Sequence, residues 1–137
     1  MRVPEHLAHK PIIGVDNYDR LDGKYSNNSD AKALSLGKSQ WDKNEISAKV
    51  WRHTGEKWTR QSEELPLHRV LDLAILIMSM YPMKDGESIV NERLDPVTIN
   101  PSEVSLIESF IQSNKEYLEP RIKEIKSIVN KIDIENE

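Results

Sequence analysis

Residues 41–69, WDKNEISAKVWRHTGEKWTRQSEELPLHR, decide how the rest of the chain is interpreted, because they gather its most distinctive side chains. All three tryptophans lie in this stretch, together with His53 and His68, two of the four histidines. From Lys38 to Arg69, seven Lys/Arg residues stand against five Asp/Glu, although the whole chain carries a net charge of −4. Indole rings that cluster with cations are typical of a shared surface or pocket. We therefore expect this stretch to bind a ligand or partner.

The composition favours a small intracellular protein. A chain of 137 residues fits one domain with its own core, and the absence of cysteine excludes disulfides, thiolate zinc sites and cysteine nucleophiles. The longest apolar run, residues 70–80, is shorter than the roughly 20 residues that a membrane span needs, and the N-terminus lacks the apolar region of a signal peptide. We expect a cytoplasmic protein with no membrane contact, and the mild net charge makes nucleic acid an unexpected partner.

The first 30 residues predict little regular structure. Residues 1–10 are polar and close to a terminus, so we expect a mobile segment. Residues 11–15, PIIGV, predict an edge strand with its proline at the start, where a ladder donor is not needed. Residues 16–30 are rich in Asp, Asn, Ser and Gly, which predicts an ordered but irregular loop.

A small antiparallel β-meander is predicted next. Residues 32–41, KALSLGKSQW, fit a strand or a helix, and we favour the strand because Gly37 would cost a helix about 1 kcal/mol. Residues 46–53 alternate as a strand does, with Trp51 and His53 on one face. Gly55 then marks a tight connection with positive φ, and residues 57–60 are expected to form the third strand.

Three helices complete the predicted α+β fold. The first covers about residues 62–81, with Ser62 as its cap and Pro66 in its first turn, and is apolar almost all round. We therefore expect it to be a buried central helix on which the sheet packs. Residues 100–137 predict a helical C-terminal extension of two amphipathic helices, one starting at residues 100–103, NPSE, and one at Pro120.

Catalytic and metal chemistry find little support in the sequence. The histidines at 6 and 9 and the aspartates at 16, 19 and 22 have no recognised metal-ligand spacing, so we expect no metal. Glu63 or Glu64 with His68 could form an acid–base pair on one helix face, but a plain pairing of Glu64 with His68 at a helix start is the simpler interpretation. With no glycine-rich phosphate loop and no nucleophile elbow, we assign no catalytic residue and no cofactor.

The predicted ligand site combines cations with aromatic rings. Arginine binds phosphate or carboxylate in a bidentate manner, and indoles stack on bases. The candidate residues are Lys49, Trp51, Arg52, His53, Trp58, Arg60, His68 and Arg69. The first hypothesis is a non-enzymatic binding protein for an anionic, nucleotide-like small ligand. The second is a protein–protein interaction or homo-oligomerisation module that acts through the C-terminal helices, and the third is a small hydrolase-type enzyme. The structural alternative is that the tryptophans fill the core and acids neutralise the cations.

The residues His9-Lys10-Pro11, DNYDRLDGKY (16–25) and ISAKVWRHTGEKWTRQSEELPLHRVLDLA (46–74) also carry a resemblance. Over roughly residues 5–80 the chain resembles a small bacterial and phage family, a domain of unknown function. The resemblance implies a bacterial or phage origin and brings no activity or site residues. Small bacterial and phage proteins that sequester signalling nucleotides are one class that fits the first hypothesis, by analogy alone.

Overall fold

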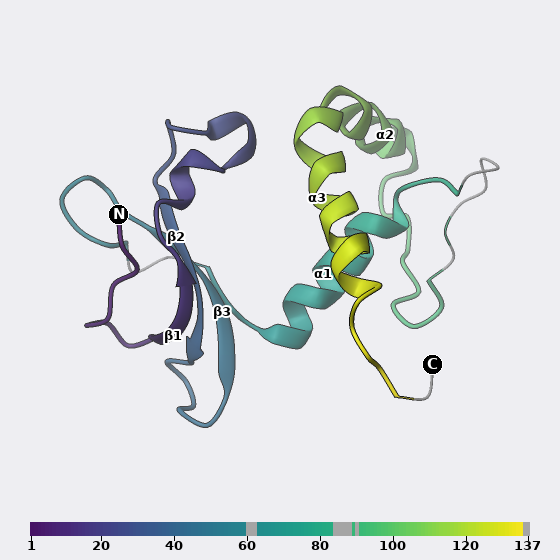
Figure 1. The fold of residues 1–137 in the computed structure, drawn as a ribbon. Helices are drawn as coiled ribbons and strands as arrows, with labels where there is room; N and C mark the ends of the chain where they lie inside the picture. Colours follow the sequence, from purple (N-terminus) through teal and green to yellow (C-terminus); the bar gives the residue numbers. More distant parts are fainter. Residues whose placement is uncertain (60–62, 84–88, 90, 136–137) are drawn as a thin grey trace. The chain divides into compact units, whose positions relative to one another are not determined.

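The computed structural model describes residues 1–59, 63–83, 89 and 91–135 (Figure 1). The chain forms two compact units, Met1–Ser79 and Met80–Glu137, and each is described by itself. A four-stranded antiparallel sheet and three α-helices make up the regular structure of the described residues, which confirms the predicted α+β class. The single domain inferred from chain length stays a prediction.

The first unit is built on a sheet whose strands follow one another in chain order. The strands are β1 (Lys10–Val15), β2 (Ala31–Lys38), β3 (Ile46–Arg52) and β4 (Glu64–Pro66), arranged β1-β2-β3-β4 with every pair antiparallel. Figure 1 labels the first three. The edge strand at residues 11–15 and the strand interpretation of residues 32–41 are confirmed. Gly37 is needed in β2 because a Cβ there would lie 2.1 Å from the carbonyl oxygen of Lys10.

The two faces of this sheet differ in polarity in an unusual way. One face carries the small or polar residues Ala33, Ser35 and Ser47, which are buried together with Trp51. The opposite face is apolar and partly open, and its paired residues are Ile13, Val15, Leu34, Leu36, Ala48, Val50 and Leu65. Hydropathy therefore does not tell which face of this sheet is covered.

The N-terminal segment is held against the sheet. The backbone N–H of Val3 donates to Asp16 Oδ1 at 2.7 Å, the N-terminal ammonium donates to Asn17 Oδ1, and the N–H of Asn17 donates to the Met1 carbonyl at 2.8 Å. His9 is 1% exposed. The segment is thus tied at its start, and its end lies in the core. The mobility predicted for residues 1–10 stays a prediction.

The connection from β3 to the first helix also differs from the prediction. Gly55 has φ +103°, as its turn requires, but only a single bridge, His53 to Trp58, pairs across this hairpin, so the predicted third strand at 57–60 does not form in its described part. The fourth strand is Glu64–Pro66 instead, where a helix start was predicted. Its Glu64 pairs with Lys49 of β3, a long-range interaction that local capping signals do not contain. The predicted cap Ser62 lies outside the described residues.

Helix α1 (Leu67–Ser79) follows β4 directly. The prediction that it is buried is wrong for the single chain, since Ser79 is its one buried residue and Leu71 is 63% exposed. Its apolar side chains are arranged all round the helix, but the described residues of the chain leave most of them at least one-third exposed. No helix of the described residues has the length and apolarity that crossing a membrane requires.

The second unit contains the two C-terminal helices that the sequence predicts. A 3₁₀ turn at Pro101–Glu103 leads into α2 (Val104–Ser113), and α3 (Lys115–Val129) follows. The helix break falls at Asn114, whose N–H bonds back to the carbonyls of α2 while its own carbonyl starts α3. The predicted start at Pro120 is therefore wrong, and that proline lies inside α3.

Candidate functional site

The structure divides seven of the eight predicted site residues into two groups. Lys49, Trp51 and Arg52 lie on β3, and His53 and Trp58 close the hairpin that follows it. His68 and Arg69 lie in the first turn of α1, and Arg60 lies outside the described residues. The two groups have different surroundings, so each is considered separately.

Trp51 and Lys49 point into the covered face of the sheet. Trp51 is 0% exposed, and its indole Nε1–H donates to Ser35 Oγ at 2.8 Å. The Lys49 ammonium lies 4.3 Å from the centre of the Trp51 ring and 3.8 Å from Glu64 Oε1. Burial lowers the pKa of Lys49, an effect that Glu64 partly offsets. This tryptophan fills the core, and this lysine neutralises a buried carboxylate.

Arg52 is exposed but engaged with acids. Its Nε donates to both carboxylate oxygens of Asp30, at 3.2 and 3.3 Å, and its Nη1 donates to Glu63 Oε1 at 3.0 Å. Asp30 is the main reason that the pKa of Arg52 lies above its ordinary value. A ligand anion at Arg52 would have to compete with two carboxylates that already use the guanidinium.

His53 and Trp58 form an edge-to-face cluster beside the core. Their ring centres lie 4.9 Å apart, and the Trp58 ring meets Trp51 edge-on at 5.9 Å. The Nδ1 of His53 accepts a hydrogen bond from the N–H of Gly55. Both rings are partly exposed, but their contacts close the hairpin onto Trp51. They stabilise the sheet end and do not form a stacking slot.

The sequence did not indicate the polar cluster that lies beneath these residues. His9 Nδ1 lies 2.9 Å from Ser47 Oγ and 3.3 Å from Glu64 Oε2, and Ser47 Oγ donates to the same carboxylate oxygen at 2.8 Å. His9 Nε2 lies 2.9 Å from Ser35 Oγ. These four side chains come from the N-terminal segment, β2, β3 and β4, so the cluster joins the parts of the unit. It was missed because its members are far apart in sequence.

The hydrogen-bond directions in this polar cluster fit a neutral His9. Ser35 Oγ accepts a hydrogen bond from the Trp51 indole, and its own hydroxyl proton can be donated to His9 Nε2. The proton of the neutral imidazole then lies on Nδ1, which faces Ser47 and Glu64. Burial lowers the pKa of His9 more than Glu64 raises it, which agrees with the neutral form. Burial raises the pKa of Glu64, but hydrogen bonds from Ser47, Gln40 and His9 outweigh it, so Glu64 stays ionised.

A serine, a histidine and a glutamate in contact raise the question of nucleophilic catalysis. Ser47 is 0% exposed and its hydroxyl donates to Glu64, whereas a nucleophile must reach a substrate and give its proton to the histidine. The arrangement therefore acts as a buried structural cluster. The predicted pairing of Glu64 with His68 on one helix face is wrong, because Glu64 lies on a strand and contacts His9, Ser47, Gln40 and Lys49.

A cavity of about 380 Å³ lies where the sheet meets α1. Its lining residues are Trp41, Glu45, Glu64, Pro66, His68 and Arg69. Trp41 is 46% exposed and donates its indole N–H to Glu45 Oε1 at 2.9 Å. The cavity thus brings His68 and Arg69 together with Trp41, which lies in the stretch 41–69 but was not among the predicted site residues. Its position at the end of the strand predicted at residues 32–41 was the available signal.

Glu64 links this cavity to the buried cluster. Its carboxylate accepts the backbone N–H of Gln40 at 3.1 Å and the Gln40 side-chain amide at 3.0 Å. Gln40 precedes Trp41, so these two bonds fix the turn that carries the exposed indole. Since the Glu64 side chain is only 2% exposed and its oxygens are engaged, it acts as a positioning residue of the cavity.

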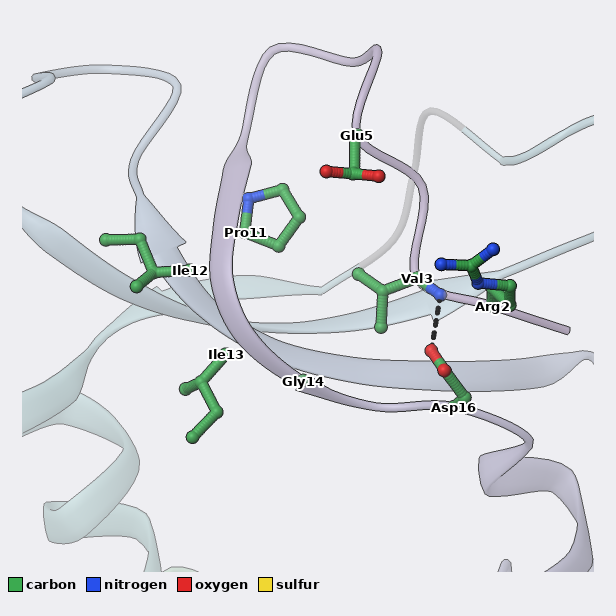
Figure 2. Close-up of a pocket in the computed structure, with 8 residues that line it drawn as sticks. All are labelled: Arg2, Val3, Glu5, Pro11, Ile12, Ile13, Gly14 and Asp16. Atoms are coloured by element: carbon green, nitrogen blue, oxygen red, sulfur yellow. Dashed lines mark hydrogen bonds between the residues drawn. The ribbon is translucent and has the colours of Figure 1, made fainter.

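A second hollow, of about 260 Å³, lies between the N-terminal segment and β1 (Figure 2). Gly14 allows the segment to pass close to the strand, because a Cβ there would lie 2.6 Å from Val3 Cγ2. In Figure 2, Ile12 and Ile13 point away from Val3 across the strand, while Arg2 and Glu5 bring opposite charges to the rim. This hollow has no aromatic face, so it is the weaker candidate for a ligand.

Comparisons with known proteins give a family and nothing on chemistry. A model described as "Family of unknown function (DUF6530)" matches residues 1–87, which include the whole first unit with its buried cluster and cavity. No curated protein and no solved structure matches the chain significantly.

Proposed function

The chain belongs to this family of unknown function, DUF6530, and because the family brings no activity we propose a function from the site itself. The protein is a non-enzymatic binding protein that holds an anionic, nucleotide-like small ligand in the cavity beside Trp41. The site is the one at residues Trp41, His68 and Arg69, rather than the whole basic–aromatic set of β3. The lack of cysteine in the sequence suits a reducing compartment, and we propose the cytoplasm.

The observation that carries this proposal is the meeting of an exposed indole with two basic side chains at one cavity. A stacked base on an aromatic ring contributes about 1–3 kcal/mol, and a charge-assisted hydrogen bond contributes about 1.5–3 kcal/mol. Ligand cavities have volumes of about 300–1,000 Å³, so a cavity of about 380 Å³ suits a mononucleotide better than a larger ligand.

One cation at the cavity is available to an anion. Among the described residues, no ion pair engages Arg69 or His68, whereas Lys49 and Arg52 are paired with acids. Of the two acids at the cavity, Glu64 faces Lys49 and Glu45 accepts from the Trp41 indole. The guanidinium of Arg69 is therefore the cation most available for a phosphate.

The test is calorimetric titration of the full chain with AMP and GMP, with adenosine and inorganic phosphate as partial ligands. Either nucleotide should bind, and each partial ligand should bind more weakly. Arg69→Ala should weaken binding by about 10- to 100-fold, which corresponds to one charge-assisted contact. Arg20→Ala, at an exposed position of the 3₁₀ turn Tyr18–Arg20, is the matched control and should bind as the wild type does. Absence of heat with both nucleotides, or equal loss in both variants, would contradict the proposal.

A second candidate function rests on the second unit. Helices α2 and α3 leave apolar side chains exposed along their lengths, including Leu106, Phe110 and Ile128, and no residue of either helix is buried. This exposure favours an interaction or homo-oligomerisation module that works through the C-terminal helices. Light scattering of Leu106→Glu in the full chain tests it, because a charge on α2 should dissolve such an assembly.

A further inference from the structure

The turn between β2 and β3, residues 39–45, is closed by its own hydrogen bonds. The N–H of Glu45 donates to the carbonyl of Asp42 at 3.0 Å, and the carbonyl of Glu45 accepts the N–H of Ser39 at 3.0 Å. The Ser39 hydroxyl donates to the Asp42 carbonyl at 2.7 Å and accepts the Asp42 N–H at 2.9 Å. A turn that is ordered in this way loses little freedom when a ligand binds. It therefore presents Trp41 and Glu45 to the cavity as a preorganised pair.

The Glu45 carboxylate lies at the edge of the Trp41 ring. The indole Nε1–H donates to Glu45 Oε1 at 2.9 Å, and both residues line the cavity of about 380 Å³. Among the described residues, this is the one hydrogen bond of that carboxylate, and no ion pair engages it. An ionised carboxylate offers about four acceptor positions, so about three remain after the indole has used one. A ligand base that stacks on Trp41 therefore has an open acceptor beside its edge.

The other acid of the cavity, Glu64, has no oxygen to spare. Hydrogen bonds from Gln40 engage both of its carboxylate oxygens, and the Lys49 ammonium lies 3.8 Å from Oε1. Glu45 therefore supplies the open acceptor, and it comes from the turn at residues 39–45, whereas the cation Arg69 comes from α1. Because a phosphate is attracted to Arg69 and repelled by Glu45, the base of the ligand belongs beside the turn and its phosphate beside the helix.

We propose that Glu45 makes this cavity selective for guanine nucleotides, an inference that rests on the nucleotide-binding function proposed above. Guanine is the one common base whose Watson–Crick edge carries two adjacent donors, N1–H and N2–H, which a carboxylate accepts together. Adenine and cytosine present a ring-nitrogen acceptor beside their amino group, and that nitrogen would face the lone pairs of Glu45. Uracil presents a single N–H between two carbonyls. One such bidentate pair corresponds to a discrimination between bases of about 10- to 100-fold.

The first test is calorimetric titration of the wild-type full chain with GMP, inosine monophosphate and AMP. Inosine monophosphate keeps the N1–H of guanine and lacks only the 2-amino group, so it removes one of the two donors. GMP should bind about 10- to 100-fold more tightly than AMP, with inosine monophosphate between them. These ligands carry the same phosphate, so the order of their affinities depends on the base alone. The comparison needs no variant and is independent of whether one folds.

The second test is Glu45→Gln, which keeps the side-chain size and a carbonyl acceptor for the Trp41 indole but replaces the second oxygen with an NH₂ donor. The ratio of GMP to AMP affinity should fall to within about threefold of unity. Glu56→Gln is the matched control, because it makes the same change at an exposed hairpin position outside the cavity, and it should keep the wild-type ratio.

The outcomes separate this inference from the function on which it rests. Equal affinities of the wild type for GMP and AMP, with Arg69→Ala still weakening both, overturn guanine selectivity and leave the nucleotide site in place. A preference for GMP that survives Glu45→Gln overturns the assignment to Glu45. Absence of binding by all three nucleotides overturns the inference together with the proposed function.

Discussion

The covered face of the sheet and helix α1 invert the usual relation between hydropathy and burial. His9, Ser35, Ser47 and Glu64 are polar or charged and are buried in the first unit. Helix α1 of the same unit is rich in apolar residues, and most of them are at least one-third exposed. The first region tolerates burial because its polar atoms bond one another, whereas the strands of the first unit leave the apolar side chains of the second region largely exposed.

The comparison shows which side chains find all their partners within the first unit. In the buried cluster, each charge has a partner, with Glu64 facing Lys49 and accepting hydrogen bonds from Ser47 and Gln40. The apolar side chains of α1 have no comparable set of contacts within the first unit. The first region should therefore respond strongly to substitution, and the second should respond weakly.

The largest effect is expected at the centre of the covered face. Trp51→Ala should lower the free energy of unfolding by about 3–5 kcal/mol, because it empties a large buried volume and leaves the Ser35 hydroxyl without the indole donor. Urea unfolding followed by circular dichroism measures it. Trp41→Ala is the control, and at its exposed position should cost less than about 1 kcal/mol. Equal losses in the free energy of unfolding for the two variants would contradict the distinction between the buried Trp51 and the exposed Trp41.

Glu64→Ala should lower the free energy of unfolding by about 3 kcal/mol. The substitution leaves Lys49 without its buried counter-charge and removes the acceptor of Ser47 and Gln40. The same urea experiment on Glu56→Ala, at an exposed hairpin position, should show almost no change. A loss below about 1 kcal/mol for Glu64→Ala would show that the cluster is not what joins β4 to the sheet.

A pair of substitutions tests the inverted relation between hydropathy and burial. Ser47→Ala should destabilise by about 1–2 kcal/mol, because it leaves His9 and Glu64 each short of a hydrogen bond in a buried site. Ile77→Ala should change the free energy of unfolding by no more than about 0.5 kcal/mol, because Ile77 is 54% exposed. A larger loss for Ile77→Ala than for Ser47→Ala would contradict this relation.

Acid should weaken the first unit through His9. The pKa of His9 is lowered in the folded state, so the unfolded chain binds the proton more readily. This contribution to stability is fully present above the ordinary pKa of about 6.5 and is lost as pH falls through the lower folded value. Tryptophan fluorescence should show a falling urea midpoint from pH 7 towards pH 5. His9→Gln should flatten that slope, and His6→Gln, exposed on the same segment, should retain it.

Local patterns predicted much of this fold. The strands at 11–15, 32–41 and 46–53, the glycine turn at Gly55 and the C-terminal helices follow from alternation, turn chemistry and capping. The helix start predicted at Glu64 and Pro66 failed for a long-range reason. Glu64 and Pro66 look like a helix start, but pairing with Lys49 and Ser47 makes them a strand, and no local signal contains that pairing.

The candidate site was predicted only in part. His68 and Arg69 do line a cavity, but the cations and rings of β3 are engaged inside the unit, through Glu64, Asp30 and ring contacts. Sequence clustering shows that residues are near one another along the chain, and it does not show which of them face solvent. The polar cluster around His9 joins residues up to 55 positions apart, beyond the reach of spacing arguments.

The three indole N–H signals in a ¹H–¹⁵N spectrum test the central claim most directly. Trp41, Trp51 and Trp58 each contribute one signal, and Trp41→Phe and Trp58→Phe assign them. On titration with AMP or GMP, the account predicts that the Trp41 signal shifts to saturation while that of buried Trp51 stays in place, and that Arg69→Ala suppresses the shift. No movement of the Trp41 signal, or movement centred on Trp51 and Trp58, would contradict a ligand site at this cavity.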